Sequence, residues 1–185
     1  MIDNIILIGL PGCGKTAIGK ILAKKLNLDF IDLDEEIVKK AKKSIPEIFA
    51  KGEDVFRKME HDVFAENIKK PQTLISTGGG IVEKEANRKL LKNCSPVIYI
   101  DRPVSEILKD LEYGTRPLLK DDKNKIYNLK NRRDARYREF ADIIVENVGN
   151  LEEVTEEIFE KVKKLKECRS NFGNGLFYVC VAGRM

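Results

Sequence analysis

The segment Gly9–Thr16 constrains the fold of this 185-residue chain more than any other segment. Its residues, GLPGCGKT, match the pattern G-x-x-x-x-G-K-[ST] of a phosphate-binding loop, or P-loop. The apolar run Ile5–Ile8 precedes the loop, and apolar residues at helical spacing follow it. Because such a loop binds phosphate between a buried strand and a helix N-terminus, the sequence predicts this unit and a nucleoside triphosphate site. A glycine-rich turn without a ligand is the alternative.

Each residue type in the P-loop has a chemical task. Glycines let successive backbone N–H groups point at phosphate oxygens, Lys15 reaches the outer phosphates, and the Thr16 hydroxyl is a ligand for Mg²⁺. The residues expected to contact the nucleotide are Gly12, Cys13, Gly14, Lys15, Thr16 and Ala17. The motif alone leaves open whether the protein is a switch, a motor or a kinase of small molecules.

Short apolar runs alternate with amphipathic segments along the chain, which is typical of βα units and a parallel sheet. The expected strands are residues 5–9, 30–33, 74–76, 97–100 and 143–145. Ser44-Ile45-Pro46-Glu47 is a capping box that predicts a short helix ending near Gly52, and a longer helix is expected from Glu53. The sequence therefore predicts an α/β fold, with a five-stranded parallel sheet flanked by helices.

Composition excludes several classes of protein. A formal charge of +4 and a hydrophobic content of 42% suit one domain with its own core. The longest apolar runs, residues 5–8 and 97–100, are too short to span a membrane, and the first residues lack the pattern of a signal peptide. The small, dispersed basic excess does not favour nucleic-acid binding. The four cysteines have no metal-binding spacing, so a cytoplasmic protein with reduced thiols is expected.

Two carboxylates, Asp32 and Asp34, come at the end of the second expected strand. Alternation along a strand would place both on one face, at the sheet edge where doubly wound folds bind ligands. One would then hold a magnesium-bound water, and the other would accept a proton from a substrate hydroxyl. The alternative is a helix N-cap with an acidic first turn, since Glu35 and Glu36 follow.

Three consecutive glycines, Gly78, Gly79 and Gly80, follow the third expected strand. Their entropic cost favours a tight turn or a close approach to a ligand, and a plain loop is the alternative. Arginine also stands out in a chain rich in lysine, at positions 57, 116 and 133. Its planar guanidinium suits a two-pronged grip on a carboxylate or phosphate, although Arg57 also has glutamates at helical salt-bridge spacing.

Taken together, these residues resemble the ordered motif set of the shikimate kinase family. The resemblance runs from about Ile5 to Leu165. It rests on the P-loop, Asp32-x-Asp34, Gly52-Glu53 with Phe56-Arg57 and Glu60, the triple glycine, Arg116-Pro117-Leu118-Leu119, and Arg133 with Tyr137. It implies an adenylate-kinase-like P-loop fold, as in nucleoside monophosphate kinases. Residues 1–165 would form one kinase domain, with a substrate-binding segment at 33–60 and a lid at 109–124, and residues 166–185 would be an extension of unknown role.

The resemblance also implies an activity, namely phosphorylation of the 3-hydroxyl of shikimate by ATP and Mg²⁺, a step toward chorismate and the aromatic amino acids. The implied catalytic residues are Lys15, Asp34 and Arg116, and Arg116 would also meet the transferring phosphate from the lid. The implied substrate-binding residues are Asp34, Arg57, Gly78, Gly79, Gly80 and Arg133, the two arginines gripping the substrate carboxylate. Thr16 and, through water, Asp32 would hold the metal.

The chain departs from the family pattern in its nucleotide-base contacts and in its tail. Lys109 stands where the resemblance implies an adenine-facing arginine, and residues 146–150 match the adenine loop only loosely. Residues 176–181 are apolar and β-prone, so an edge strand, an association surface and an unstructured extension all stay open. We expect a monomer without nucleic-acid or membrane partners. The alternatives are a P-loop kinase of another polyhydroxy acid, such as gluconate, and a non-catalytic nucleotide-binding homologue.

Overall fold

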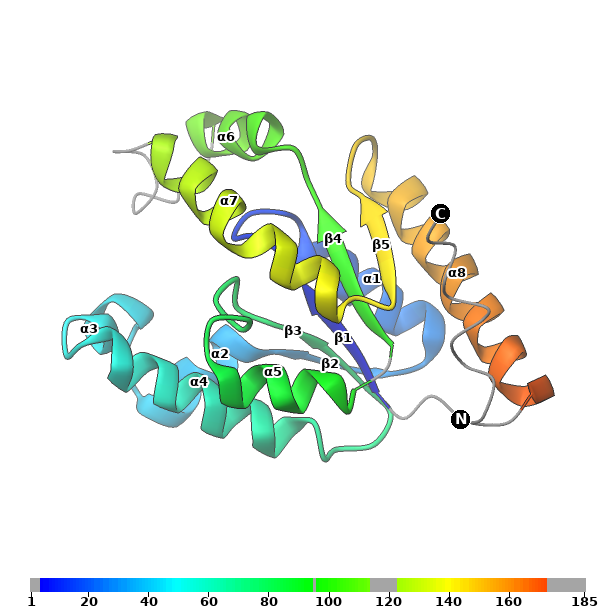
Figure 1. The fold of residues 1–185 in the computed structure, drawn as a ribbon, viewed down its shortest axis with the longest axis horizontal. Coiled ribbons are helices and arrows are strands. Elements are labelled where there is room, and N and C mark those ends of the chain that lie inside the picture. The colour runs from blue at the N-terminus through cyan, green and yellow to red at the C-terminus, as the bar shows by residue number, and fades with distance from the viewer. Residues whose placement is uncertain (1–3, 95, 114–122, 173–185) are drawn as a thin grey trace.

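Five parallel strands form one sheet in the order β2-β3-β1-β4-β5. The structure is a computed structural model, which describes residues 4–94, 96–113 and 123–172 (Figure 1). The strands are β1 (Asn4–Ile8), β2 (Asp29–Asp32), β3 (Thr73–Ser76), β4 (Val97–Asp101) and β5 (Ile143–Glu146). The α/β fold with five parallel strands that the sequence predicts is confirmed.

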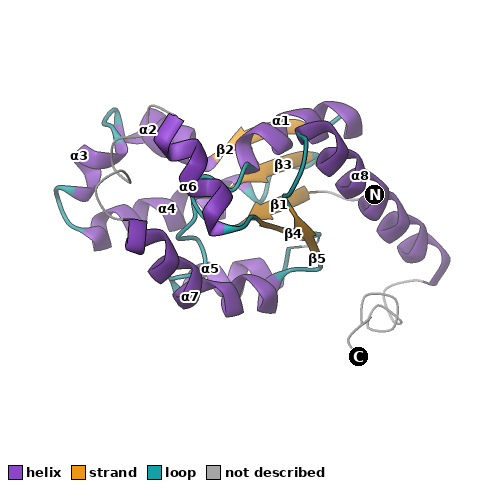
Figure 2. Ribbon diagram, turned by 90° about the horizontal axis from the view of Figure 1, so that it is seen from above, coloured by secondary structure: helices purple, strands orange, loops and turns teal. Residues whose placement is uncertain are grey.

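Helices cover both faces of this sheet. They are α1 (Lys15–Leu26), α2 (Leu33–Ala41), α3 (Ile45–Phe49), α4 (Glu53–Asn67), α5 (Glu85–Lys92), α6 (Val104–Tyr113), α7 (Lys123–Phe140) and α8 (Leu151–Phe172). Figure 2 shows the sheet between α1 and α8 on one side and α5 and α7 on the other. Over the part of the chain that is described, no helix is both long and apolar enough to cross a bilayer.

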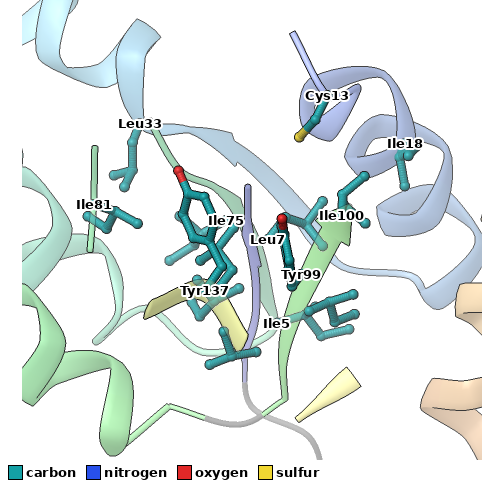
Figure 3. Close-up of a cluster of buried hydrophobic side chains, with 14 of the residues drawn as sticks. Ile5, Leu7, Cys13, Ile18, Leu33, Ile75, Ile81, Tyr99, Ile100 and Tyr137 are labelled. Atoms are coloured by element: carbon teal, nitrogen blue, oxygen red, sulfur yellow. The ribbon is translucent and has the colours of Figure 1, made fainter. Parts of the chain in front are cut away.

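The core is built on β1, the central strand. Its residues Ile5–Ile8 are fully buried, as a continuous apolar run should be when both neighbours and both faces are covered. At the sheet edge, β5 instead alternates buried and exposed residues. Figure 3 shows side chains from β1, β3 and β4 packed together with Tyr137 of α7. The ring centroids of Tyr137 and Tyr99 are 5.0 Å apart.

Local signals set several boundaries. The capping box is present, because the Glu47 carboxylate accepts hydrogen bonds from the backbone N–H and hydroxyl of Ser44 at 2.7 and 2.6 Å. α4 begins at Glu53 as expected. The second strand ends at Asp32, not Leu33, because Asp32 caps α2.

Two expected segments lie partly or wholly outside the described residues. The expected lid, residues 109–124, begins inside α6 and ends inside α7, and residues 114–122 between these helices lie outside the description. α8 continues past residue 165 to Phe172, so one helix crosses the expected domain boundary. The apolar segment 176–181 lies outside the described residues.

Candidate active site

A cavity of about 820 Å³ opens at the edge where the parallel strands end. Its wall includes the P-loop after β1, Asp32 at the end of β2, Gly79 after β3, Arg102 after β4 and Asn147 after β5. Because parallel strands end at one edge, segments far apart in the sequence meet there. The sheet topology therefore assembles the site from all five strands.

The P-loop directs the N-terminus of α1 toward this cavity. Gly14, directly before α1, has a φ of 99°, a left-handed conformation that other residues rarely adopt. The carbonyl oxygens of Gly12 and Cys13 accept hydrogen bonds from Arg102 Nη1 at 3.3 Å and Asn147 Nδ2 at 2.8 Å. Since Gly14 supplies no side-chain cap to α1, the first N–H groups of this helix and the positive end of its dipole can bind an anion.

Lys15 lies folded against the loop that it belongs to. Its side chain is buried, and its Nζ donates to the carbonyl oxygens of Gly9 at 3.0 Å and Leu10 at 2.8 Å. A charged phosphate oxygen is a stronger acceptor for an ammonium than a carbonyl, so a bound phosphate competes well for this group. The Cys13 side chain is fully buried in the core cluster (Figure 3), so its contact with a ligand must come from its backbone.

Asp32 has two tasks, one for each carboxylate oxygen. Its Oδ1 accepts from the backbone N–H of Asp34 at 3.0 Å and of Glu35 at 3.4 Å, which makes it the N-cap of α2. Its Oδ2 accepts from the Thr16 hydroxyl at 2.8 Å. The expectation that strand alternation aligns the two aspartates is wrong, because the cap ends the strand and Asp34 lies in the first helical turn. Both aspartates nevertheless line the cavity.

The pair Thr16 and Asp32 fits a magnesium site. The hydroxyl and carboxylate are oxygen donors in direct contact beside the phosphate-binding helix terminus. No cluster of three or more His, Cys, Asp or Glu side chains suited to a metal occurs among the described residues. Mg²⁺ does not need one, because it keeps several waters and is commonly bound by one or two protein groups plus phosphate oxygens.

The triple glycine brings several elements into close contact. A Cβ atom on Gly79 would lie 2.5 Å from the ring of Pro11 in the P-loop, and one on Gly80 would lie 2.0 Å from Arg57 Nη1. A Cβ on Gly78 would lie 2.9 Å from Asp34 Oδ1. No side chain fits in this space without displacing a neighbour, so close approach, and not a plain loop, explains the glycines.

Arg57 reaches the triple glycine from α4. It is mostly buried and pairs with Glu53, through Nη2 at 3.1 Å, and with Glu60, through Nη1 at 2.9 Å. Glu60 is 1% exposed, and within the described residues its Oε1 has no hydrogen-bond partner. Burial raises the pKa of Glu60, and the positive charge of Arg57 opposes that rise.

Arg133 reaches the same turn from α7. Its Nη1 donates to the Gly79 carbonyl at 3.1 Å, and the Tyr137 hydroxyl donates to the same oxygen. Its Nε donates to Glu83 at 2.6 Å, and Glu83 also pairs with two further arginines, Arg132 and Arg136. Burial disfavours the charged form of Glu83, but hydrogen bonds from the arginines outweigh it and lower the pKa. The Arg133 guanidinium is thus fixed between the Gly79 carbonyl and the Glu83 carboxylate.

Comparisons with known proteins identify the family to which this chain is similar. The family model described as shikimate kinase matches residues 11–163. A shikimate kinase from Clostridium botulinum (strain Alaska E43 / Type E3) is 46% identical over 158 residues, which cover 85% of this chain and 96% of that protein. The chain belongs to the shikimate kinase family. A relative from Clostridium beijerinckii, also named shikimate kinase, is 40% identical over 88% of this chain and 96% of its own length.

Solved structures of shikimate kinases have the same fold. One from Acinetobacter baumannii in complex with shikimate superposes with a TM-score of 0.81 at 32% identity, covering 92% of this chain and 96% of that one. One from Aquifex aeolicus gives a TM-score of 0.75 at 38% identity, covering 86% and 96%. A gluconokinase from Sinorhizobium meliloti, at 16% identity and a TM-score of 0.65, shows a shared fold alone.

In this member of the shikimate kinase family, the predicted site residues fall into four groups. The cavity wall contains Gly12, Gly14, Lys15, Thr16, Ala17, Asp32, Asp34 and Gly79. Two further residues adjoin that wall, because Arg133 bonds to Gly79 and Gly78 lies against Asp34. Arg57 and Gly80 contact each other behind it, and the Cys13 side chain is buried, so these three do not line the cavity. Arg116 lies outside the described residues.

Three polar residues around this shikimate kinase site were not among the predicted site residues. Arg102 and Asn147 hold P-loop carbonyls, and Glu83 holds Arg133. For Arg102 and Asn147 a signal exists, because each lies two residues beyond an apolar run predicted to be a strand. Glu83 carries no local signal, because its partners lie about fifty residues away.

Proposed function

We propose that this chain transfers the γ-phosphoryl group of ATP to the 3-hydroxyl of shikimate, giving shikimate 3-phosphate and ADP. The observation that carries the proposal is the contact between two halves of the site. Pro11 of the P-loop lies against Gly79, and Arg133 holds the Gly79 carbonyl. The phosphate-binding loop and the Gly79 turn that Arg133 holds therefore lie in the same cavity wall. Phosphoryl transfer between two bound molecules requires such an arrangement, because the reacting atoms must come within about 3.5 Å of each other.

On the nucleotide side, backbone N–H groups of the P-loop and α1 orient the phosphates, and Lys15 neutralises the outermost charge. The nucleotide contacts proposed are Gly12, Cys13, Gly14, Lys15, Thr16 and Ala17. Mg²⁺, when bound, supplies further neutralisation of the phosphate oxygens. The Thr16 hydroxyl and, through water, the Asp32 carboxylate would hold it, as their 2.8 Å contact supports.

On the acceptor side, Asp34 is exposed to the cavity and is proposed to take the proton of the 3-hydroxyl. The oxygen of that hydroxyl forms a bond to the γ-phosphorus while the bond from phosphorus to the β–γ bridging oxygen breaks, and ADP leaves. Arg57 and Arg133 are proposed to grip the substrate carboxylate. Glu53, one of the partners of Arg57, is 62% exposed, and an exposed pair contributes under about 1 kcal/mol, so a carboxylate can replace it.

Arg116 is proposed to enter from the lid, residues 109–124, and to neutralise charge on the transferring phosphoryl group. We further propose that residues 1–165 act as one kinase domain, that the chain works as a monomer, and that it resides in the cytoplasm. The free thiols of Cys13 and Cys94 are consistent with a reducing compartment.

The alternatives are a kinase of another polyhydroxy acid, such as gluconate, and a non-catalytic nucleotide-binding homologue. The likeness to a gluconokinase extends to the fold alone, whereas a relative named shikimate kinase is 46% identical over 85% of this chain. The presence of Lys15, Asp34, Arg57 and Arg133 in one assembly supports catalysis over mere nucleotide binding.

A coupled assay of ADP release, run over shikimate, gluconate and other polyhydroxy acids, tests the assignment. We expect turnover of shikimate to dominate. Equal rates on gluconate, or no ADP release with any acid at saturating ATP and Mg²⁺, would refute it.

Substitution of Arg133 tests the carboxylate grip. Arg133→Lys keeps the charge but loses the planar fork, and the lost contact should cost about 2–4 kcal/mol, or roughly 30- to 1000-fold in kcat/KM for shikimate. Arg136→Lys is the matched control, because Arg136 also pairs with Glu83, at 2.9 Å, but does not bond to Gly79. Near wild-type kcat/KM in Arg133→Lys, or an equal loss in the control, would contradict the grip.

A further inference from the structure

The sheet order divides the cavity into two halves. β1 and its P-loop are central, with β3 and β2 on one side and β4 and β5 on the other. Residues after β2 and β3, such as Asp34 and Gly79, form the acceptor half. The rest of the wall comes from segments that follow β4 and β5 and is formed by Arg102, Ile107, Asp110, Asn147, Gly149 and Leu151. With the phosphates at the central loop and the acceptor on one side, the nucleoside must occupy this second half.

Arg102 is the cation of this second half. It follows β4 directly, its side chain is 20% exposed, and its Nη1 bonds to the Gly12 carbonyl at 3.3 Å. Asp110 of α6 pairs with the same guanidinium at 2.6 Å and restricts its orientation. Lys109, the neighbouring cation, pairs with Glu106 at 2.8 Å, is 64% exposed and does not line the cavity. The guanidinium is therefore fixed at the cavity wall, and the Lys109 ammonium is not.

The chemistry of a guanidinium suits a nucleoside at this place. Its plane stacks on the π-face of a base, and its charge is attracted to the ring electrons. One end of the Arg102 guanidinium is already committed to Gly12 and Asp110, which lowers the entropy lost when a ligand binds.

We propose that Arg102 is the residue that grips the nucleoside of the bound nucleotide, by packing its guanidinium plane on the base while Nη1 stays on the P-loop carbonyl. This inference rests on the proposed function in one respect, the use of a nucleoside triphosphate. It gives Arg102 a specificity role that phosphate contacts alone cannot supply, since every nucleotide carries the same phosphates.

Comparing a nucleotide with a bare phosphate chain separates this role from support of the P-loop. Isothermal titration calorimetry would measure binding of ADP and of inorganic tripolyphosphate, both with Mg²⁺, to the full chain. In Arg102→Gln we expect ADP affinity to fall about tenfold, while tripolyphosphate affinity stays within about twofold of wild type. Lys89→Gln on α5 is the control, because it breaks an exposed pair with Glu85 away from the cavity, and it should bind both ligands as wild type does.

A second variant distinguishes loss of base stacking from a disturbed P-loop. Arg102→Lys keeps a charged donor near Gly12 and Asp110 but has no plane, so ADP affinity should fall as in Arg102→Gln, again with tripolyphosphate binding retained. An equal loss for both ligands would show that Arg102 acts on the phosphates through the loop and would overturn the proposal. Unchanged ADP binding in Arg102→Gln, or full ADP affinity in Arg102→Lys, would overturn it as well.

Failure of the proposed function gives a different pattern. A wild-type chain that binds ADP with the expected Arg102 dependence but does not phosphorylate shikimate would refute the proposed function and support the role of Arg102. A wild-type chain that binds tripolyphosphate but not ADP would refute the nucleoside site itself.

Discussion

At the scale of single residues, Asp32 shows how one carboxylate serves structure and function together. The sequence offered an N-cap and a metal site as alternatives, and the N-cap is confirmed by bonds from the backbone N–H groups of Asp34 and Glu35. The second oxygen points to Thr16, so the cap does not exclude the proposed metal role. Two lone-pair-bearing oxygens allow both tasks at once.

Asp32→Asn separates these two tasks. Asparagine caps helices as well as aspartate, so the free energy of unfolding should change by less than about 1 kcal/mol. The lost charge should weaken the proposed magnesium site, and the Mg²⁺ concentration for half-maximal rate should rise about fivefold or more. Initial rates measured over a Mg²⁺ titration give this value.

Asp34→Asn is the comparison for that experiment. It removes the proposed proton acceptor, so kcat should fall by a factor of about 100 or more without a matching shift in the Mg²⁺ dependence. If both variants shift the Mg²⁺ dependence alike, the division of roles between the two aspartates is wrong.

At the scale of elements, α7 carries part of the acceptor half and is fastened to β4. Arg133 and Tyr137 bond to Gly79 on one side. Elsewhere on the helix a charged cluster, formed by Tyr99, Asp101, Lys130, Asp134 and Arg138, ties α7 to the end of β4. Because Arg133 lies on α7, the bonds that fix α7 against β4 also help to fix the position of Arg133.

The acid dependence of stability tests the cluster. Burial disfavours the charged form of Asp134, but hydrogen bonds from Lys130, Arg138 and Tyr99 outweigh this and lower its pKa to about 2. A carboxylate whose pKa is lowered by folding stabilises the protein above its unfolded value, near 4, and loses that contribution as the pH falls toward 2.

Asp134→Asn should therefore lower the free energy of unfolding by about 1 kcal/mol at pH 7, a modest value because the group is partly exposed. The difference from wild type should shrink toward zero as the pH falls from 4 to 2. Urea unfolding at several pH values measures this. Glu157→Gln, which breaks an exposed pair with Lys161 on α8, is the control and should change stability by less than about 0.5 kcal/mol. A difference that is constant with pH would show that the charge of Asp134 does not act in this way.

At the scale of the whole molecule, α8 covers one face of the sheet beside α1 (Figure 2). Its buried residues include Val154, Ile158, Val162 and Leu165, and Leu165 is the last buried residue among those described. The family match ends at residue 163, within the same helix. The packing of the kinase domain therefore depends on α8 up to this point.

Truncation tests the domain boundary. A chain that ends at Phe172 keeps all of α8, so its melting temperature should stay within about 2 °C of wild type and its shikimate kinase activity should be retained. A chain that ends at Asn150 lacks α8 and exposes the apolar face of α1 and the sheet, so it should not fold cooperatively. Circular dichroism and the ADP-release assay measure both effects. Loss of folding in the longer truncation would show that the domain extends into residues 173–185.

The sequence by itself determined the features that depend on near neighbours in the chain. The P-loop, its flanking strand and helix, the capping box at Ser44 and the five strands follow from spacing, apolar runs and residue type, which act over a few residues. The motif set also identified the family, because its members occur in one order along the chain. Strand alternation at Asp34 failed because a local competitor, the N-cap of Asp32, ended the strand first.

Only the tertiary structure decided how distant residues meet. Arg102 reaches Gly12 across 90 residues, Asn147 reaches Cys13 across 134, and Arg133 reaches Glu83 across 50. The crowding that forces glycine at position 80 likewise comes from Arg57 on another element. No local pattern encodes these pairs, because they exist only once the strand order places the ends of β3, β1, β4 and β5 side by side at one edge of the sheet.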